Sequence, residues 1–460
     1  MSYSALHACR TLTQPQVAVD AAVAIHAESL LNRAAQYLRL LGVEFKLLTF
    51  VNAMIPICAA LGLQFVTFAI TARGLGVAQF GAYTALLALV GVAVELTGLG
   101  GGDLLVRAVS RNRASFQLYY GNMLTLLAMT LPVVVLGGVI VAIFGMQSTV
   151  TVLGVSIALF GEILVARMSA SLELVMVAHE KVVQAGWIRM LTIAVRLCVA
   201  AAFFILFAQH SLNGWIVVVF VQAIIVSAAY VVLAAKLFGR PIWALQTGEL
   251  STGTSFCVSQ SARAMQSNLD RMVLSRFADD AALGLYGAAS RILQLGLFPI
   301  QVVMRTLSVK FYVHGAHGLK ASRRYALQVA PTLVGVGVFS ALCVAATALL
   351  APLVLGRDFA AATGTTLRLA CALPLIALQY PAADALSGAG LQTLRAHIYV
   401  AAAVGFGFVL VAGVRLGGIN GLIYAFLLGH LLLAVVLWVC TFVCVDKKPT
   451  GATLIEQLPP

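Results

Sequence analysis

Twelve long apolar stretches restrict what this chain of 460 residues can fold into. Each is about 20 residues or longer, enough for an α-helix to cross a hydrocarbon core roughly 30 Å thick. The apolar residues are continuous rather than alternating, which disfavours a transmembrane β-barrel. Charged residues make up only 10% of the chain, against about 25% in a soluble domain. We therefore predict an all-α integral membrane protein with helices over residues 47–71, 82–106, 117–144, 149–178, 186–208, 215–238, 254–278, 283–308, 325–355, 363–388, 397–414 and 419–443.

Lysine and arginine concentrate in alternate connections between these helices, which predicts the orientation of the chain. Basic connections normally stay in the cytoplasm. The basic set holds Arg107, Arg111, Arg113, Lys181, Lys236, Arg240, Lys310, Lys320, Arg323, Arg324, Arg395, Lys447 and Lys448. The opposite set holds only Arg73, Arg276, Arg357 and Arg415. With an even number of helices, both termini are expected in the cytoplasm. This bias accounts for most of the net charge of +13, so nucleic-acid binding is not expected.

The domain organisation follows from the spacing of the helices. Residues 1–46 form a cytoplasmic extension that is amphipathic over 28–41 and lacks the compact apolar core of a signal peptide. Six helices over 47–238 and six over 254–444 form two lobes, joined by the polar linker 239–253 and followed by a tail, 445–460. No connection between helices is long enough to hold a soluble catalytic domain.

An internal repeat supports the division into two lobes. The stretch "RGLGVAQFGAY" joins the first two helices, and "RFADDAALGLY" joins the seventh and eighth. Both read R-x7-G-x-Y, and matched placement in the topology predicts two halves in parallel orientation. The matched residues are Arg73, Gly81 and Tyr83 in the first half and Arg276, Gly284 and Tyr286 in the second.

Two stretches resemble a known family. "GLGVAQFGAYTALLALVGVAVELTGLGGGDLLVR" resembles the second-helix region of bacterial polysaccharide flippases, and "NLDRMVLSRFADDAALGLYGAASRI" resembles their seventh and eighth helices. These flippases belong to the superfamily of multidrug, oligosaccharidyl-lipid and polysaccharide exporters. The resemblance implies two lobes around a central cavity and a multi-pass protein of the bacterial inner membrane. Twelve helices fit O-antigen or exopolysaccharide flippases better than the lipid II flippase, which has fourteen.

The resemblance also implies an activity and partners. Family members move undecaprenyl-diphosphate-linked oligosaccharides to the outer leaflet, for O-antigen, capsule or exopolysaccharide assembly. We expect such a lipid-linked oligosaccharide as substrate, contact with membrane lipids, and a polysaccharide polymerase and chain-length regulator as partners. No cofactor, metal or enzymatic step is expected.

Two neighbouring helices carry polar stripes within the predicted membrane region. A polar stripe inside a membrane can face only protein or a water-filled cavity. On the seventh helix the stripe holds Gln260, Arg263, Gln266, Ser267, Asp270 and Arg271. On the eighth it holds Tyr286, Ser290, Arg291, Gln294, Gln301 and Arg305.

Some of these charges are expected to pair. Two residues of an antiparallel helix pair lie at one depth when their numbers share a constant sum. This places Glu162 level with Arg196 and Glu173 level with Arg189. It also places Asp270 level with Arg291. Structural pairing is the default interpretation of all three pairs. Asp270, Glu95 and Asp103 are alternatives for coupling to an ion gradient, and Asp384 adds a further deep carboxylate.

Four arginines are left without an obvious acidic partner, and an anionic substrate would supply the missing charge. A lipid diphosphate can be held bidentately by guanidinium groups. We therefore predict a substrate-binding cavity that includes Gln260, Arg263, Arg271, Arg291, Gln294, Arg305 and Arg368, of which Arg263, Arg271, Arg305 and Arg368 are the unpaired cations. Tyr83, Tyr286 and Tyr380 are candidates for stacking on sugars, or anchors at the membrane interface.

Two other functions fit the same composition. A cation-coupled multidrug or small-molecule exporter of this architecture would favour acidic residues in its cavity, whereas the deep charges here lean towards arginine. An integral-membrane enzyme of polysaccharide assembly would need an acid–base cluster or a metal site, and neither stands out in the sequence.

The charge distribution predicts a testable topology. Reporter fusions at Gln147 and His210 should read periplasmic, and fusions at Lys320 and Lys447 should read cytoplasmic, because basic connections are retained inside. Alkaline phosphatase activity reports a periplasmic fusion, and fluorescence of a fused fluorescent protein reports a cytoplasmic one. One reversed pair would contradict the arrangement of two parallel lobes.

Overall fold

The computed structural model describes residues 47–147, 150–179 and 181–444, and all regular structure in these ranges is helical. The described residues before Pro56 belong to a different compact unit from those that follow, and the account below concerns residues 56–444. The predicted amphipathic segment 28–41 and the tail fall outside the described residues. The α-helices are α2 (Leu47–Leu96), α3 (Gly101–Arg111), α4 (Phe116–Gly145), α5 (Val152–Ala178), α6 (Val182–Ala201), α7 (Leu212–Phe238), α8 (Leu250–Phe277), α9 (Asp280–Gly315), α10 (Leu319–Leu355), α11 (Ala362–Ala370), α12 (Ala372–Gly388) and α13 (Gln392–Val443).

Two of these helices reverse direction and so supply two segments each. The backbone of α2 is non-helical at Gly76, with φ 71°. The rings of Phe68 and Phe80 lie 5.7 Å apart, whereas twelve residues of continuous helix would span about 18 Å. In α13 the break falls at Gly417 and Gly418. Each long helix is therefore a hairpin of two helices.

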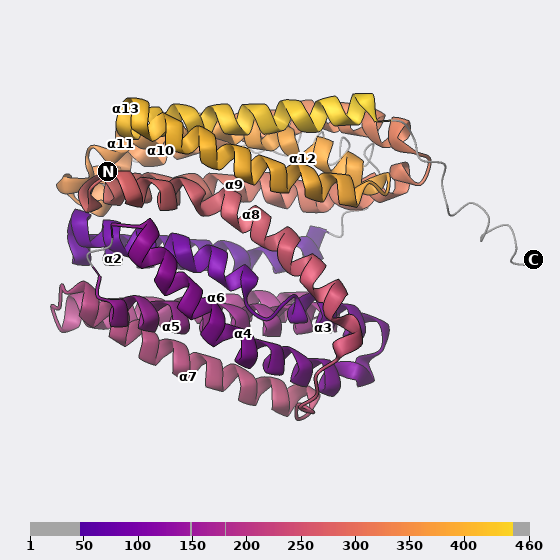
Figure 1. Ribbon diagram of the computed structural model, residues 1–460, viewed down its shortest axis with the longest axis horizontal. Coiled ribbons are helices and arrows are strands. Elements are labelled where there is room, and N and C mark those ends of the chain that lie inside the picture. The colour runs from indigo at the N-terminus through magenta and orange to yellow at the C-terminus, as the bar shows by residue number, and fades with distance from the viewer. Residues whose placement is uncertain (1–46, 148–149, 180, 445–460) are drawn as a thin grey trace, which may run out of the picture. The chain divides into compact units, whose positions relative to one another are not determined.

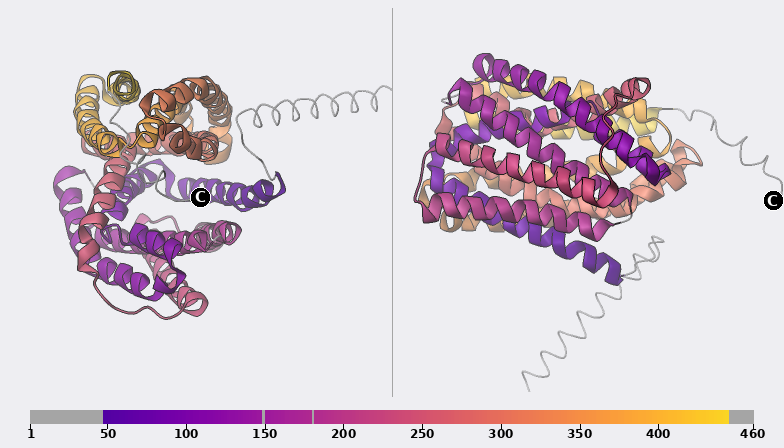
Figure 2. Two further views of the ribbon diagram at one scale, coloured as in Figure 1. Left: turned by 90° about the vertical axis from the view of Figure 1, so that its right-hand side faces the viewer. Right: turned by 90° about the horizontal axis from the view of Figure 1, so that it is seen from below.

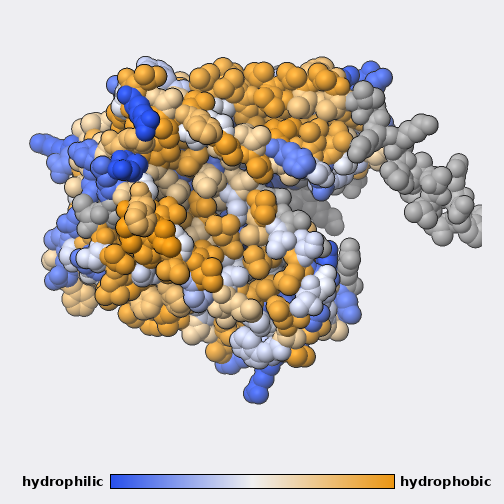
Figure 3. All heavy atoms as spheres, in the orientation of Figure 1, coloured by the Kyte–Doolittle hydropathy of each residue, from blue (hydrophilic) through white to orange (hydrophobic). Residues whose placement is uncertain are grey.

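The count of helices agrees with the prediction of twelve segments. Nine helices of the described chain are long and apolar enough to cross a membrane. Two of them are the hairpins just described. Each hairpin counts once among the nine but supplies two segments, and α11 and α12 together count as one of the nine. The charged helix α8 is not among the nine and is the twelfth segment. On the face shown in Figure 3, apolar residues predominate, and strongly hydrophilic groups lie mostly towards the two ends of the helices. The protein is an all-α membrane protein, as predicted.

The second segment is interrupted, contrary to the prediction of one helix over 82–106. The α-helix stops at Leu96 and resumes as α3 at Gly101. Between them Gly98, Leu99 and Gly100 adopt positive φ angles of 80°, 44° and 70°. The stretch "TGLGGG" explains the break, because glycine favours such conformations and disfavours helix.

The chain of residues 56–444 folds as two lobes, shown in Figure 1 and from two further sides in Figure 2. Helices α2, from Pro56 onwards, to α7 form the N-lobe, and α9 to α13 form the C-lobe. Helix α8 begins beside the N-lobe, where Gly253 meets Gly100 and the Cys257 thiol lies 3.3 Å from the Glu95 carbonyl oxygen. Its second half packs against α13, with Leu269 beside Gly407.

The two repeat glycines meet where the lobes touch. A Cβ on Gly81 would collide with the carbonyl of Asp280, and a Cβ on Gly284 would collide with the carbonyl of Val77. When the two repeat motifs are aligned, Val77 matches Asp280 and Gly81 matches Gly284. The two contacts are therefore equivalent in the two halves. The repeat therefore marks an approximate two-fold axis, and glycine allows the backbones to approach closely there.

Several turns gather at the same end of the lobes, which we call the closed end. The Arg73 guanidinium donates to the carbonyl of Leu353, and the rings of Phe80 and Phe359 lie 6.0 Å apart. The amide of Gln147 donates to the Ser275 carbonyl at 3.0 Å. Each of these contacts joins the N-lobe to the C-lobe or to α8. We call the opposite end, where residues 239–249 run, the linker end.

The linker is attached to the N-lobe. Its backbone amides at Ile242 and Gln246 donate to the carbonyl of Gln117 and the side chain of Asn122, both in α4. Glu249 forms an ion pair with Arg107 at 2.5 Å and accepts from the Tyr119 hydroxyl. Helix α8 starts at Leu250, four residues before the predicted boundary of the C-lobe.

The two predicted ion pairs between α5 and α6 are confirmed. Glu162 pairs with Arg196, and Arg189 lies 2.8 Å from Glu173. Glu162 is 8% exposed and also accepts from the Tyr83 hydroxyl, whereas the Arg189 side chain is 48% exposed. The first pair is therefore a buried network and the second a partly solvated contact.

The glycine contact between the lobes predicts an effect on stability. Gly284→Ala forces the α2 and α9 backbones apart and should cost about 1–3 kcal/mol, the usual range for overpacking. Gly335→Ala is the matched control, because no atom lies near its added methyl group. Thermal unfolding of the detergent-solubilised protein measures both. Equal melting temperatures would contradict the contact.

The two ion pairs predict unequal costs. Glu162→Gln leaves Arg196, whose side chain is only 20% exposed, without a carboxylate, which should cost about 3 kcal/mol, the lower end of the range for a buried pair. Glu173→Gln affects a pair whose arginine is half-exposed, and should cost about 1 kcal/mol or less. The amount of protein in the membrane and the thermal unfolding temperature should fall clearly for Glu162→Gln only. A reversed order would show that Glu162 is not the structural anchor.

Candidate substrate-binding cavities

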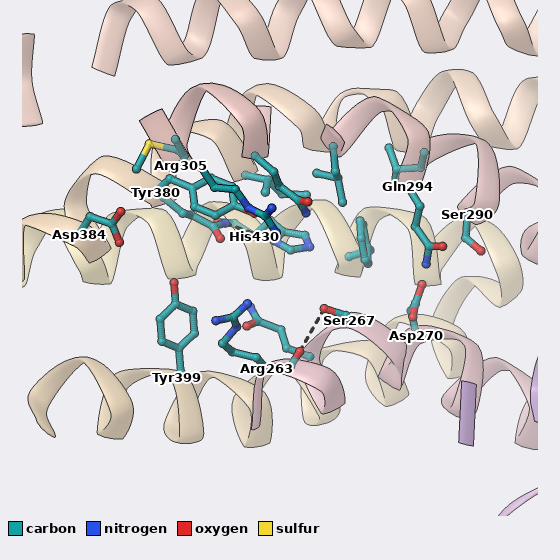
Figure 4. Close-up of a pocket in the computed structure, with 18 of the residues that line it drawn as sticks. Arg263, Ser267, Asp270, Ser290, Gln294, Arg305, Tyr380, Asp384, Tyr399 and His430 are labelled. Atoms are coloured by element: carbon teal, nitrogen blue, oxygen red, sulfur yellow. Dashed lines mark hydrogen bonds between the residues drawn. The ribbon is translucent and has the colours of Figure 1, made fainter. Parts of the chain in front are cut away.

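A cavity of about 410 Å³ lies inside the C-lobe, bounded by α8, α9, α12 and α13. Four arginines and two aspartates line it, so its formal charge is +2. Figure 4 shows Arg263, Arg305, Tyr380 and Tyr399 pointing into a common space, with Asp270, Ser290 and Gln294 further along the cavity. The charged lining residues are Arg263, Asp270, Arg271, Arg305, Asp384 and Arg395.

Two of these arginines are paired with the aspartates. Arg271 lies 3.7 Å from Asp270, and both side chains are almost fully buried. Asp270 also accepts from the Tyr286 hydroxyl at 2.7 Å. Arg395 lies 3.1 Å from Asp384 and donates to Ser387. These contacts hold α8 to α9 and α12 to α13.

The other two arginines have no such partner. In the part of the chain that the structure describes, no carboxylate lies within ion-pair distance of Arg263 or Arg305, and neither guanidinium donates to a protein oxygen. Both side chains are exposed to the cavity. The cavity therefore offers two guanidinium groups to an anion.

One wall of the C-lobe cavity is neutral. Gln379 on α12 donates to the backbone carbonyl of His430 at 2.8 Å, and its amide lies 3.2 Å from the imidazole. The rings of Phe406 and Phe426 flank His430 at 5.4 and 4.6 Å. These contacts fix the wall in place opposite α8.

A second cavity, of about 590 Å³, lies in the N-lobe and is bordered by α9 of the other lobe. The buried network of Tyr83, Glu162 and Arg196 lies in its wall, and Gln222 accepts from Arg196 at 3.0 Å. The two repeat tyrosines therefore act alike, since each donates to a buried carboxylate in its own half. Gln294 and Gln301 of α9 line both cavities.

Arg291 differs from its predicted role. It lines the N-lobe cavity and donates to Gln294 at 3.3 Å. Asp270 turns instead towards Arg271 and Tyr286. The predicted pair of Asp270 and Arg291 is wrong, because equal depth does not fix the direction in which two side chains point.

Three other predictions for unpaired or substrate-binding residues are corrected. Arg271 has an acidic partner, as described. Arg368 lines neither cavity: it is exposed and donates to Asn420 at 2.5 Å and to Gly364. Gln260 also lies outside both cavities, one turn towards the linker end from Arg263. The other five predicted members do line a cavity: Arg263, Arg271, Arg291, Gln294 and Arg305.

The predicted coupling residues of the second segment also lie elsewhere. Glu95 forms an ion pair with Arg167 at 3.3 Å. Asp103 lies beyond the helix break, in the first turn of α3. Neither residue lines the cavities, so only Asp270 of the three faces one.

Sequence reasoning missed several lining residues. Tyr399, His430 and Gln64 were not singled out, although a lone polar residue within an apolar stretch is a usable signal for a residue that faces a cavity. The phenylalanines of the N-lobe cavity carry no such signal, because lipid-facing positions have the same composition.

Comparison with known proteins identifies the family. A family model described as "Polysaccharide biosynthesis protein" matches residues 49–306. No curated protein sequence matches. Among solved structures, the inward-facing form of a multidrug resistance MATE family transporter of the MOP superfamily superposes with a TM-score of 0.65 at 14% identity, covering 85% of this chain and 97% of that one.

Two further structures share the fold. The MATE multidrug transporter DinF-BH gives a TM-score of 0.58 at 17% identity over 86% of this chain and 94% of that one. The Vibrio cholerae MATE transporter VcmN in its bent form gives 0.53 at 15% identity over 86% and 97%. With the family model matching more than half of its length, the chain belongs to the polysaccharide biosynthesis protein family.

Proposed function

We propose that the protein is a flippase that moves undecaprenyl-diphosphate-linked oligosaccharides across the bacterial inner membrane. The observation that carries this proposal is the pair of arginines, Arg263 and Arg305, that face the C-lobe cavity without a carboxylate partner. Family membership supports an exporter used in polysaccharide synthesis.

The chemistry of the two arginines supports an anionic ligand. A charged side chain at the bilayer centre costs about 2.5–3.5 kcal/mol on insertion scales, a cost that concerns Arg263 more than Arg305, which ends the apolar part of α9. A retained guanidinium without an internal partner is therefore expected to interact with water or with a ligand. A diphosphate offers several oxygens in the geometry that the planar guanidinium fork matches.

The arrangement of the lobes supports alternating access. The lobes touch at the closed end through glycine backbones and a few side chains. If basic connections lie in the cytoplasm, the closed end faces the periplasm, and Arg305, near the linker end of α9, lies where a head group enters from the inner leaflet. Reversal of the contacts would then expose the cavities to the outer side.

A multidrug exporter is the second candidate, because the proteins that share this fold include multidrug transporters of the MATE family. The charge of the C-lobe cavity disfavours cationic drugs, since a surplus of two positive charges repels them. Anionic amphiphiles remain compatible with the same cavity. Efflux of a cationic dye by cells expressing the protein would favour this second candidate.

The proposal predicts a defined response to arginine replacement. Arg263→Ala and Arg305→Ala should each reduce surface polysaccharide at least about tenfold, since the loss of a hydrogen bond to a charged group costs roughly 1.5–3 kcal/mol. Lysine should rescue only in part, because it lacks the planar fork. Surface polysaccharide and membrane protein level are measured together in a strain that depends on this gene.

Arg368→Ala is the matched control, because Arg368 is exposed and lies outside both cavities. It should export normally. Full export by the double variant Arg263→Ala/Arg305→Ala, at normal abundance, would exclude the C-lobe cavity from the transport path.

A further inference from the structure

The N-lobe cavity has walls of a different chemistry from those of the C-lobe cavity. Three aromatic rings, those of Phe65, Phe68 and Phe298, line it and are partly exposed. Phe80 and Trp215 lie buried in the same wall, and the Phe68 and Phe80 rings are 5.7 Å apart. The accessible rings therefore lie beside buried aromatic side chains in the same wall of the cavity.

Amide side chains stand beside these rings. Gln64 and Gln301 are exposed, and Gln294 is half-buried. Within the described chain, the Gln64 side chain makes no hydrogen bond, and the Gln294 oxygen accepts from Arg291. A carboxamide presents both donors and an acceptor, so these groups can donate hydrogen bonds to hydroxyl groups and accept hydrogen bonds from them.

The deep part of the N-lobe cavity is balanced in charge. Glu162 and Arg196 neutralise each other, and Tyr83 and Gln222 complete their hydrogen bonds. The one further charge in this cavity's lining is Arg291, which reaches Gln294 at the border with the C-lobe cavity. An anion is therefore better accommodated on the C-lobe side, and a neutral polar group on the N-lobe side.

The two cavities adjoin along α9. Gln294 and Gln301 line both of them. At 1.5 Å per residue, Gln301 lies about 6 Å and Gln294 about 16 Å along the helix from Arg305. A ligand whose anion is held by Arg263 and Arg305 can therefore extend past these glutamines into the N-lobe.

We propose that the N-lobe cavity is the subsite that binds the saccharide of the substrate. This proposal rests on the proposed function as a flippase. Sugar rings would pack their C–H faces on Phe65, Phe68 and Phe298, and their hydroxyls would bond to Gln64, Gln294 and Gln301. A sugar combines an apolar face with hydroxyl groups, and this cavity combines aromatic surface with uncharged amides. The diphosphate stays in the C-lobe cavity.

The test compares two probes on the purified full-length protein in lipid nanodiscs. One is undecaprenyl diphosphate, and the other is the lipid-linked oligosaccharide extracted from cells in which this gene is deleted. Phe65→Ala/Phe68→Ala and Gln64→Ala should weaken binding of the glycosylated lipid about fivefold to tenfold and change binding of the bare lipid less than about twofold. Arg263→Ala should weaken both probes alike.

Controls separate binding from folding and from lipid contact. Phe408→Ala removes a ring that is 74% exposed and outside both cavities, and should leave both affinities unchanged. Phe65→Leu/Phe68→Leu keeps the apolar volume and should show the same selective loss if stacking matters. Thermal unfolding confirms that each variant is folded.

The outcomes distinguish the two proposals. Equal weakening of both probes by the N-lobe variants, no weakening of either, or equal affinity of the unmodified protein for both probes would overturn the saccharide subsite and leave the flippase proposal standing. Failure of the unmodified protein to bind either probe would overturn the flippase proposal itself.

Discussion

A guanidinium group inside a membrane needs an anion, and this constraint organises the structure. Arg196, Arg167 and Arg395 meet carboxylates of neighbouring segments and so fasten helices together. Arg263 and Arg305 have no carboxylate within ion-pair distance among the described residues, and both face a cavity. The same physical cost that makes paired arginines structural makes the unpaired arginines the candidate site. The distinction rests on partners and not on residue type.

The scaffold places this site through a small contact between the lobes. Glycines at positions 81 and 284 bring the α2 and α9 backbones together at the closed end. Helix α9 then runs between the two cavities and contributes glutamines to both. A long, continuous α9 opposite a broken second segment also makes the halves unequal, although they share a repeat. This inequality is consistent with one cavity for charge and another for neutral groups.

The rule that residues of an antiparallel helix pair lie level when their numbers share a constant sum succeeded where two helices face each other directly. Glu162 with Arg196 and Glu173 with Arg189 share depth and direction on adjacent helices, so equal depth was enough. It failed for Asp270 and Arg291, because Tyr286 and Arg271 occupy the directions around the aspartate. It gave no information on Arg368, which lies near a helix end where Asn420 and solvent can satisfy it.

The sequence by itself determined the membrane class, the number of segments, the two halves and the set of deep charges. Hydropathy, segment length and a repeated motif are local properties, and the cost of burying charge acts on each residue wherever the helix lies. Only the tertiary structure decided which arginines lack a carboxylate partner, that the second segment breaks at Gly98 to Gly100, and that Gln294 and Gln301 line both cavities. These features depend on the rotation of each helix about its axis and on contacts between segments far apart in the chain, which no spacing along the sequence specifies.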